Sequence, residues 1–97
     1  MAISAQDLQN WHLTRELPTE YEEKINDRLR YAAVVVEREG QELYCWNIAR
    51  DVLRSHLGDI STKDLESLLV RYRAQGWKIR RFKSQCEMVE FTCPLPN

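Results

Sequence analysis

The segment from residue 61 to residue 93 changes its hydrophobic period halfway along, and this change constrains the fold more than any other feature. The first half, "STKDLESLLVRYRA", repeats leucines and a tyrosine at helical spacing, behind a Ser61 whose hydroxyl can cap the helix at the Asp64 N–H. Gly76 ends that pattern. "WKIRRF" and "EMVEFTC" then partly alternate apolar and polar residues around the short link "KSQC". The chain is therefore predicted to end in a helix and a β-hairpin.

Three more helices are predicted before residue 61. Ser4 can cap a short helix over "AQDLQNWHLTREL", whose thin apolar stripe suits a peripheral position. A long second helix is predicted over "EYEEKINDRLRYAAVVVEREG", begun by Thr19 as its cap and ended by Gly40. A third is predicted over "QELYCWNIARDVLRSHL", where a wide apolar arc indicates the central helix of the core.

Residues 32–45 also admit a second interpretation. Three consecutive valines favour a β-strand, and "EREGQE" is suited to a turn, so "AAVVVEREGQELYC" would then form a β-hairpin. The continuous apolar stripe favours the helix, and the hairpin remains the alternative.

Length and composition indicate one domain. The chain has 97 residues, 43% of them hydrophobic, which is enough to bury a core without disulfides or metal ions. The predicted fold class is α+β, mostly helical, with four helices and a C-terminal two-stranded β-hairpin. Within the single domain 1–97 we expect a peripheral N-terminal helix over 1–17, a helical core over 19–75 and the β-hairpin over 77–93.

Neither a metal site nor a membrane segment is predicted. Cys45, Cys86 and Cys93 form no C-x-x-C pair, and the two histidines lack zinc-finger spacing, so we expect no bound metal and no other cofactor. The first residues resemble no secretory signal, and no apolar run reaches the length of a membrane span. A soluble, cytoplasmic protein with free thiols is expected.

Catalysis is not predicted either. His56, with Cys45 or Cys86, is the one candidate for an activated thiol, but His56 falls on the apolar arc of its predicted helix and is better explained as a packed side chain. Neighbouring glutamates such as Glu22 and Glu23 do not converge on a helix, so they predict no acid–base pair. We therefore expect a protein that is not an enzyme.

Residues 43–93 resemble a winged helix-turn-helix domain. The features that carry the resemblance are the buried segment "WNIARDVLRSHL", the turn "GDI", the capped helix with Leu65, Leu68 and Leu69, and the strands "GWKIRRF" and "EMVEFT". The resemblance implies that the second helix of the pair enters the DNA major groove and that the basic hairpin lies along phosphates. Asp64 and Glu66 near the start of that helix favour backbone contacts over base reading.

Charge is distributed unevenly in a chain of net charge −1. The stretch from Arg71 to Cys86 holds six basic residues and no acidic one, whereas the first 43 residues are acidic. These cations predict a small regulatory binding protein whose contacts with nucleic acid are dominated by the backbone of DNA. The alternative is an adaptor or inhibitor that docks the same hairpin on an acidic partner protein. In either case the predicted binding residues are Arg71, Arg73, Lys78, Arg80, Arg81 and Lys83.

A protein partner has some further support in the sequence. Apolar side chains off the main helical stripes can meet a second chain or another copy of this one, and they predict a homodimer if they cluster in space. The residues concerned are Tyr31, Val34, Ile48 and Val70.

Overall fold

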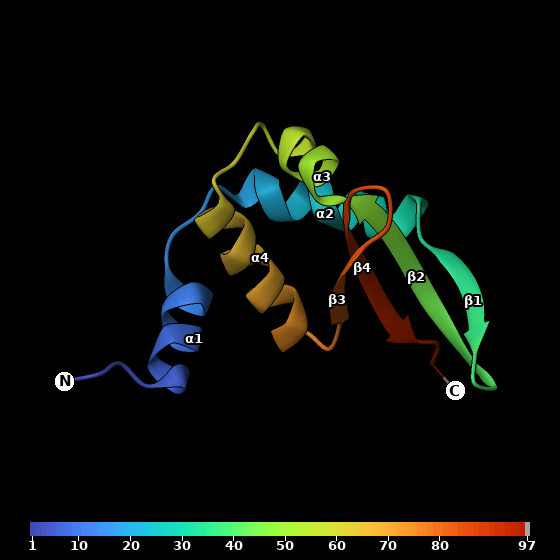
Figure 1. The fold of residues 1–97 in the computed structure, drawn as a ribbon, viewed down its shortest axis with the longest axis horizontal. Helices are drawn as coiled ribbons and strands as arrows, with labels where there is room; N and C mark the ends of the chain where they lie inside the picture. The colour runs from blue at the N-terminus through green and yellow to red at the C-terminus, as the bar shows by residue number, and fades with distance from the viewer. Residues whose placement is uncertain (97) are drawn as a thin grey trace.

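The structure is a computed structural model that describes residues 1–96, and it combines four helices with four strands (Figure 1). Along the chain these are α1 (Ala5–Thr14), α2 (Thr19–Tyr31), β1 (Val34–Arg38), β2 (Gln41–Ala49), α3 (Arg50–His56), α4 (Thr62–Ala74), β3 (Lys78–Lys83) and β4 (Glu87–Pro94).

All four strands form one antiparallel sheet in the order β1-β2-β4-β3. The register places Trp46, Phe91 and Ile79 side by side across β2, β4 and β3. Their neighbours one residue along point to the opposite face, because side chains alternate along a strand. The sheet therefore has a core face, and an outer face that includes Cys45 and Glu90.

The helices supply the other half of the core. Ile25 of α2, Leu53 of α3 and Leu68 of α4 are fully buried together with Phe91 of β4. Phe91 also contacts three aromatic rings, those of Trp46, Tyr72 and Trp77. At about 25 cal/mol for each Å² of apolar surface, burying such a cluster is the main stabilising contribution to the fold.

Helix α1 lies outside this core. It begins at Ser4, whose hydroxyl accepts a hydrogen bond from the Asp7 N–H as predicted, and none of its residues is buried. It packs on α4, at the opposite end of the molecule from the tip of the β1–β2 hairpin (Figure 1). The predicted peripheral position is correct.

The long helix predicted up to Gly40 is wrong, and the alternative hairpin is confirmed. Helix α2 ends at Tyr31, and β1 then pairs with β2 through a two-residue turn at Glu39 and Gly40. Both turn residues have positive φ, 53° and 77°, as a two-residue hairpin turn requires. The consecutive valines fit the pleated backbone better than a helix. Thr19 is the first helical residue and not the cap; Pro18 occupies that position without a side-chain cap.

The helix predicted over residues 41–57 is also wrong in its first half. Residues 41–49 form β2, and only Arg50–His56 is helical. Cys45 and Trp46 are both buried because they project to opposite faces of the sheet, which a helical apolar arc cannot distinguish. The predicted helical core over 19–75 is therefore interrupted by two strands, and the predicted two-stranded hairpin is half of a four-stranded sheet.

The C-terminal prediction is correct. The Ser61 hydroxyl accepts from the Asp64 N–H at 3.1 Å, α4 ends just before Gly76, and β3 pairs with β4. Gly76 has φ of 100°, a backbone conformation that glycine adopts without strain. The coarse class is thus α+β with four helices in one domain, and within residues 1–96 no helix has the length and apolarity needed to cross a membrane.

Candidate nucleic-acid interface

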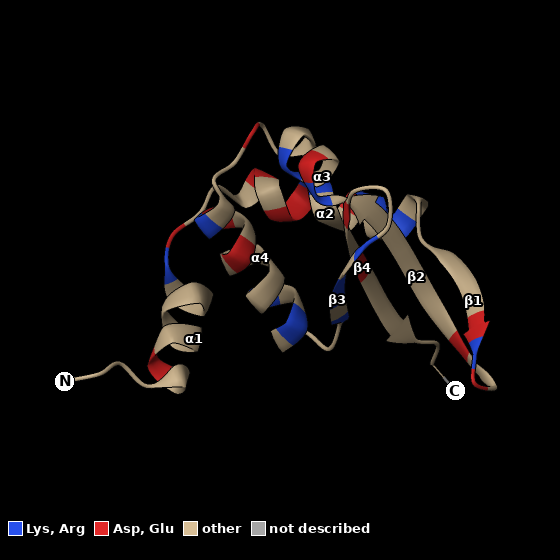
Figure 2. Ribbon diagram, viewed as in Figure 1, with Lys and Arg blue, Asp and Glu red and all other residues tan. Residues whose placement is uncertain are grey.

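The six predicted binding cations do not form one patch. The turn of α4 and the alternation of β3 distribute them over three places: the interior contact between α1 and α4, the helix side of the sheet, and its outer face. Figure 2 shows the basic residues of the α4 C-terminal end beside those of β3.

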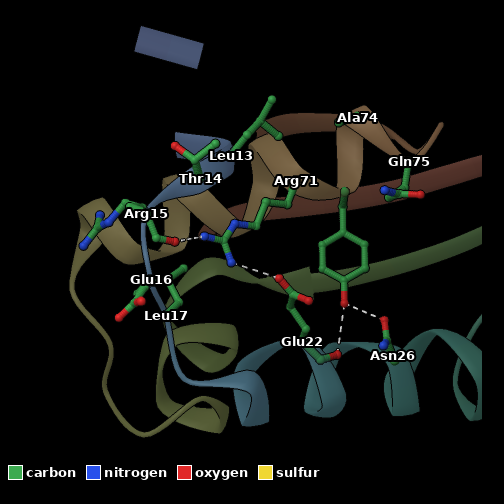
Figure 3. A pocket seen from close by; sticks show the side chains of 11 residues that line it. Leu13, Thr14, Arg15, Glu16, Leu17, Glu22, Asn26, Arg71, Ala74 and Gln75 are labelled. Atoms are coloured by element: carbon green, nitrogen blue, oxygen red, sulfur yellow. Dashed lines mark hydrogen bonds and ion pairs between the residues drawn. The ribbon is translucent and has the colours of Figure 1, made fainter. Parts of the chain in front are cut away.

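Arg71 holds α1 and α2 onto α4. Its guanidinium donates to the His12 carbonyl at 3.2 Å, to the Arg15 carbonyl and to the Glu22 carboxylate at 3.0 Å (Figure 3). Only 19% of its side chain is exposed. This arginine is therefore engaged inside the protein, and little of its charge is presented to a ligand.

A pocket of about 700 Å³ opens beside Arg71, between the end of α1, helix α2 and helix α4 (Figure 3). The Tyr72 hydroxyl on its wall donates to the Glu22 carbonyl and to the Asn26 side chain, and burial raises the pKa of Tyr72. Within residues 1–96 every buried side-chain nitrogen and oxygen has a hydrogen-bond partner. The polar groups of this pocket thus serve the packing of three helices.

Three of the predicted cations lie on the helix side. Arg81 projects from β3 towards α4 and pairs with Glu66, while Arg73 and Lys83 are exposed and form no ion pair among the described residues. Arg73 shares the exposed face of α4 with Thr62, Lys63 and Val70, since these positions recur at helical spacing. This set, together with β3, forms what we call the α4–β3 surface: Thr62, Lys63, Val70, Arg73, Arg81 and Lys83.

Both carboxylates at the start of α4 are neutralised within the chain. Asp64 accepts from Arg15 of α1 at 2.7 Å instead of reaching back to its own cap, and Glu66 pairs with Arg81. The Ser67 hydroxyl between them is in contact with His12 at 2.8 Å. The acidic character that sequence alone assigns to the start of this helix is therefore largely cancelled.

Lys78 and Arg80 project from the outer face of the sheet, around a buried glutamate. Glu90 accepts two hydrogen bonds of 2.8 Å from Arg38 of β1, and the Arg80 guanidinium lies 3.4 Å away. Hydrogen bonding by Arg38 lowers the pKa of Glu90 to about 2. Burial, followed by the charge of Glu90, raises the pKa of the neighbouring Cys45 thiol.

A pocket on this outer face lies between two of the cations. Arg38 and Lys78 line it, with Thr92, Leu43 and Pro94 among the other lining residues. The mixture of basic and apolar groups differs from the wholly polar exposed face at the start of α4.

Two contributors to these surfaces were not predicted. Arg50 begins α3 and lines a small pocket together with Arg81 and Lys83, because β2 leads straight into α3 beside the β3–β4 hairpin. Arg38 reaches Glu90 across β2. Strict alternation in "EMVEFTC" does place Glu90 opposite the core residues Val89 and Phe91, but no local signal identifies its partner.

The thiol and imidazole groups considered as a nucleophile are not associated. Cys45 contacts Glu90 on the outer face of the sheet, whereas the His56 ring on α3 is 3.4 Å from the Arg28 guanidinium. Residues 1–96 contain no group of three histidine, cysteine, aspartate or glutamate side chains placed to hold a metal ion.

No protein-family model, curated protein or solved structure matches the chain.

Proposed function

We propose that this protein is a non-catalytic binding protein that contacts the backbone of duplex DNA through its α4–β3 surface, in the manner of a winged helix. The observation that carries the proposal is the charge balance on this surface. Its two nearby carboxylates, Asp64 and Glu66, are paired inside the chain, whereas Arg73 and Lys83 remain available.

The arrangement of elements supports the same proposal. Helix α3, the turn, helix α4 and the β3–β4 hairpin follow one another as in the resemblance to winged helices, and α4 adjoins β3. A capped helix that leaves one face exposed can approach a groove while cations on an adjoining hairpin meet phosphates. The exposed face offers Thr62 and Lys63 near the helix start and no glutamine or asparagine for reading bases, so modest sequence preference is expected.

The two faces of β3 provide a matched experiment. Arg73→Glu with Lys83→Glu reverses two cations on the helix side, and Lys78→Glu with Arg80→Glu reverses two associated with the outer face. The change in net charge is identical, so a difference in affinity reports position and not overall charge.

Fluorescence anisotropy with random duplex and single-stranded oligonucleotides, each at low and moderate salt, is the measurement. We expect duplex binding that weakens steeply with salt, is lost in the helix-side variant and is largely retained in the outer-face variant. Absence of binding by the wild-type protein at low salt would refute the proposal. Loss of binding in the outer-face variant alone would show that the wrong surface is assigned.

The second candidate function is an adaptor or inhibitor that docks on an acidic partner protein. The observation that favours it is the outer-face pocket, where Arg38 and Lys78 flank apolar Leu43 and Pro94. Such a mixture suits acidic and apolar side chains of a peptide better than a uniform phosphate backbone. An acidic peptide probe that binds the wild-type protein but not the outer-face variant, in the absence of oligonucleotide binding, would favour this function.

A further inference from the structure

The two edges of the sheet differ in the protection they carry against further strand pairing. Edge strand β3 has a cation at four of its six positions, and these charges on both faces discourage another strand from pairing. Edge strand β1 opens with three valines and carries no charge before Glu37. One edge is blunted by charge, and the other is left apolar.

Apolar side chains gather around the β1 edge. Val34 and Val35 are 59% and 52% exposed, and Tyr31, just before the strand, is 84% exposed. Tyr44, also exposed, is the cross-strand neighbour of Val35. Of the four apolar residues singled out in the sequence, Tyr31 and Val34 belong to this edge, whereas Ile48 packs against the core and Val70 lies on α4.

Hydrogen-bonding geometry leaves one register of this edge open. From the two-residue turn, Arg38 and Gln41 face each other as the closing pair, so alternate residues of β1 direct their backbone groups to β2. Val35 and Glu37 then direct their N–H and C=O groups away from the sheet. An antiparallel strand centred opposite Val35 satisfies those groups.

Charge at the two ends of β1 indicates what that strand is. The hairpin tip carries Glu37, Glu39 and Glu42, with Glu37 directly opposite Glu42, and none of these carboxylates has an ion pair among the described residues. Like charges opposite each other across a strand pair are destabilising. The other end of β1 adjoins the C-terminal turn of α2, where Arg28 and Arg30 are exposed.

We propose that two copies of this chain pair through β1, antiparallel about a two-fold axis at Val35, to form a continuous eight-stranded sheet. The two-fold axis sets Val34 against Val36 of the other copy, and it brings the acidic tip of each copy to the basic α2 end of the other. The contact is isologous and closes on itself, so it gives a dimer and not a filament. It leaves the α4–β3 surface, at the other edge of the sheet, uncovered.

The first test removes the outward hydrogen bonds. Val35→Pro deletes an N–H that points away from β2, a position at which an edge strand tolerates proline, whereas the matched Val34→Thr keeps the backbone of β1 intact. Sedimentation equilibrium over a wide range of chain concentration is the measurement. We expect a wild-type dimer, an increase of at least about tenfold in the dissociation constant for Val35→Pro, and little change for Val34→Thr. A wild-type chain that stays monomeric at high concentration would overturn the proposal.

The second test does not depend on how well β1 tolerates proline. Arg28→Glu with Arg30→Glu makes the α2 end acidic, and Glu37→Lys with Glu39→Lys makes the tip basic; all four side chains are exposed, so folding is not at risk. Each variant alone is expected to be monomeric, because like charges then meet at both ends of the two-fold interface. Neither order of association is rescued by mixing, whereas the chain that carries all four substitutions is expected to dimerise again. Dimers in both separate variants would show that the interface lies elsewhere, and a peptide strand from another protein on β1 would then be the remaining occupant.

Discussion

Replacing Glu90 with glutamine tests whether the outer face of the sheet is held by a buried ion pair. The substitution keeps the shape of the side chain but removes the charge that accepts two 2.8 Å hydrogen bonds from Arg38. Only 4% of the Glu90 side chain is exposed, so its charge depends on these partners and not on water. We expect Glu90→Gln to lower the free energy of unfolding.

The magnitude follows from the pKa of Glu90. It falls from the ordinary 4.5 to about 2 in the folded protein. At 1.36 kcal/mol for each unit, this difference corresponds to an upper limit of about 3 kcal/mol. Because 43% of the Arg38 side chain is exposed, solvent screening reduces that figure, and we expect about 2 kcal/mol.

The sign of the pH dependence is fixed by the lowered pKa. The stabilisation is fully present above the unfolded pKa of about 4.5 and is lost as the pH falls towards the folded value of about 2. Urea unfolding, followed by the fluorescence of the buried Trp46, should therefore show a gap between the wild-type protein and Glu90→Gln near neutral pH that narrows by more than half at about pH 3.

Glu87→Gln is the control, because this carboxylate lies on the same strand but is exposed. Equal stability of wild-type protein and Glu90→Gln at neutral pH, or a gap that persists unchanged in acid, would refute the assignment of a stabilising buried ion pair.

Three further predictions concern other contacts. Arg71→Met should lower the free energy of unfolding by about 2 kcal/mol and increase amide hydrogen exchange in α1 before the sheet, because α1 loses the donors to its C-terminal carbonyls; unchanged exchange in α1 would contradict this role. Ser61→Ala should cost about 1 kcal/mol in urea unfolding through loss of the α4 cap, whereas Thr62→Ala, one residue along, should cost less. A thiol reagent should modify the exposed Cys86 well before Cys45, which is buried with a raised pKa; peptide mapping by mass spectrometry would reveal the opposite order.

Much of the candidate site was readable only in part. Sequence alone found the cations of β3 and the end of α4, because a run of basic residues needs no partner to be seen. It did not separate Arg71, which is engaged by carbonyls of α1 more than fifty residues away in sequence, from Arg73, which is exposed. It also treated Arg80 and Arg81 as equivalent, although strand alternation directs one to Glu90 and the other to Glu66.

The sequence by itself determined the elements whose signals are local. The caps at Ser4 and Ser61, the helical spacing of the α4 leucines and the short β3–β4 link each act within a few residues, so they predict structure without reference to the rest of the chain. Tertiary structure decided between helix and strand for residues 32–49. There the apolar pattern suits both, and β2 becomes a strand because β4 pairs with it and Trp46 packs on Phe91, contacts between segments about forty residues apart that no local pattern records.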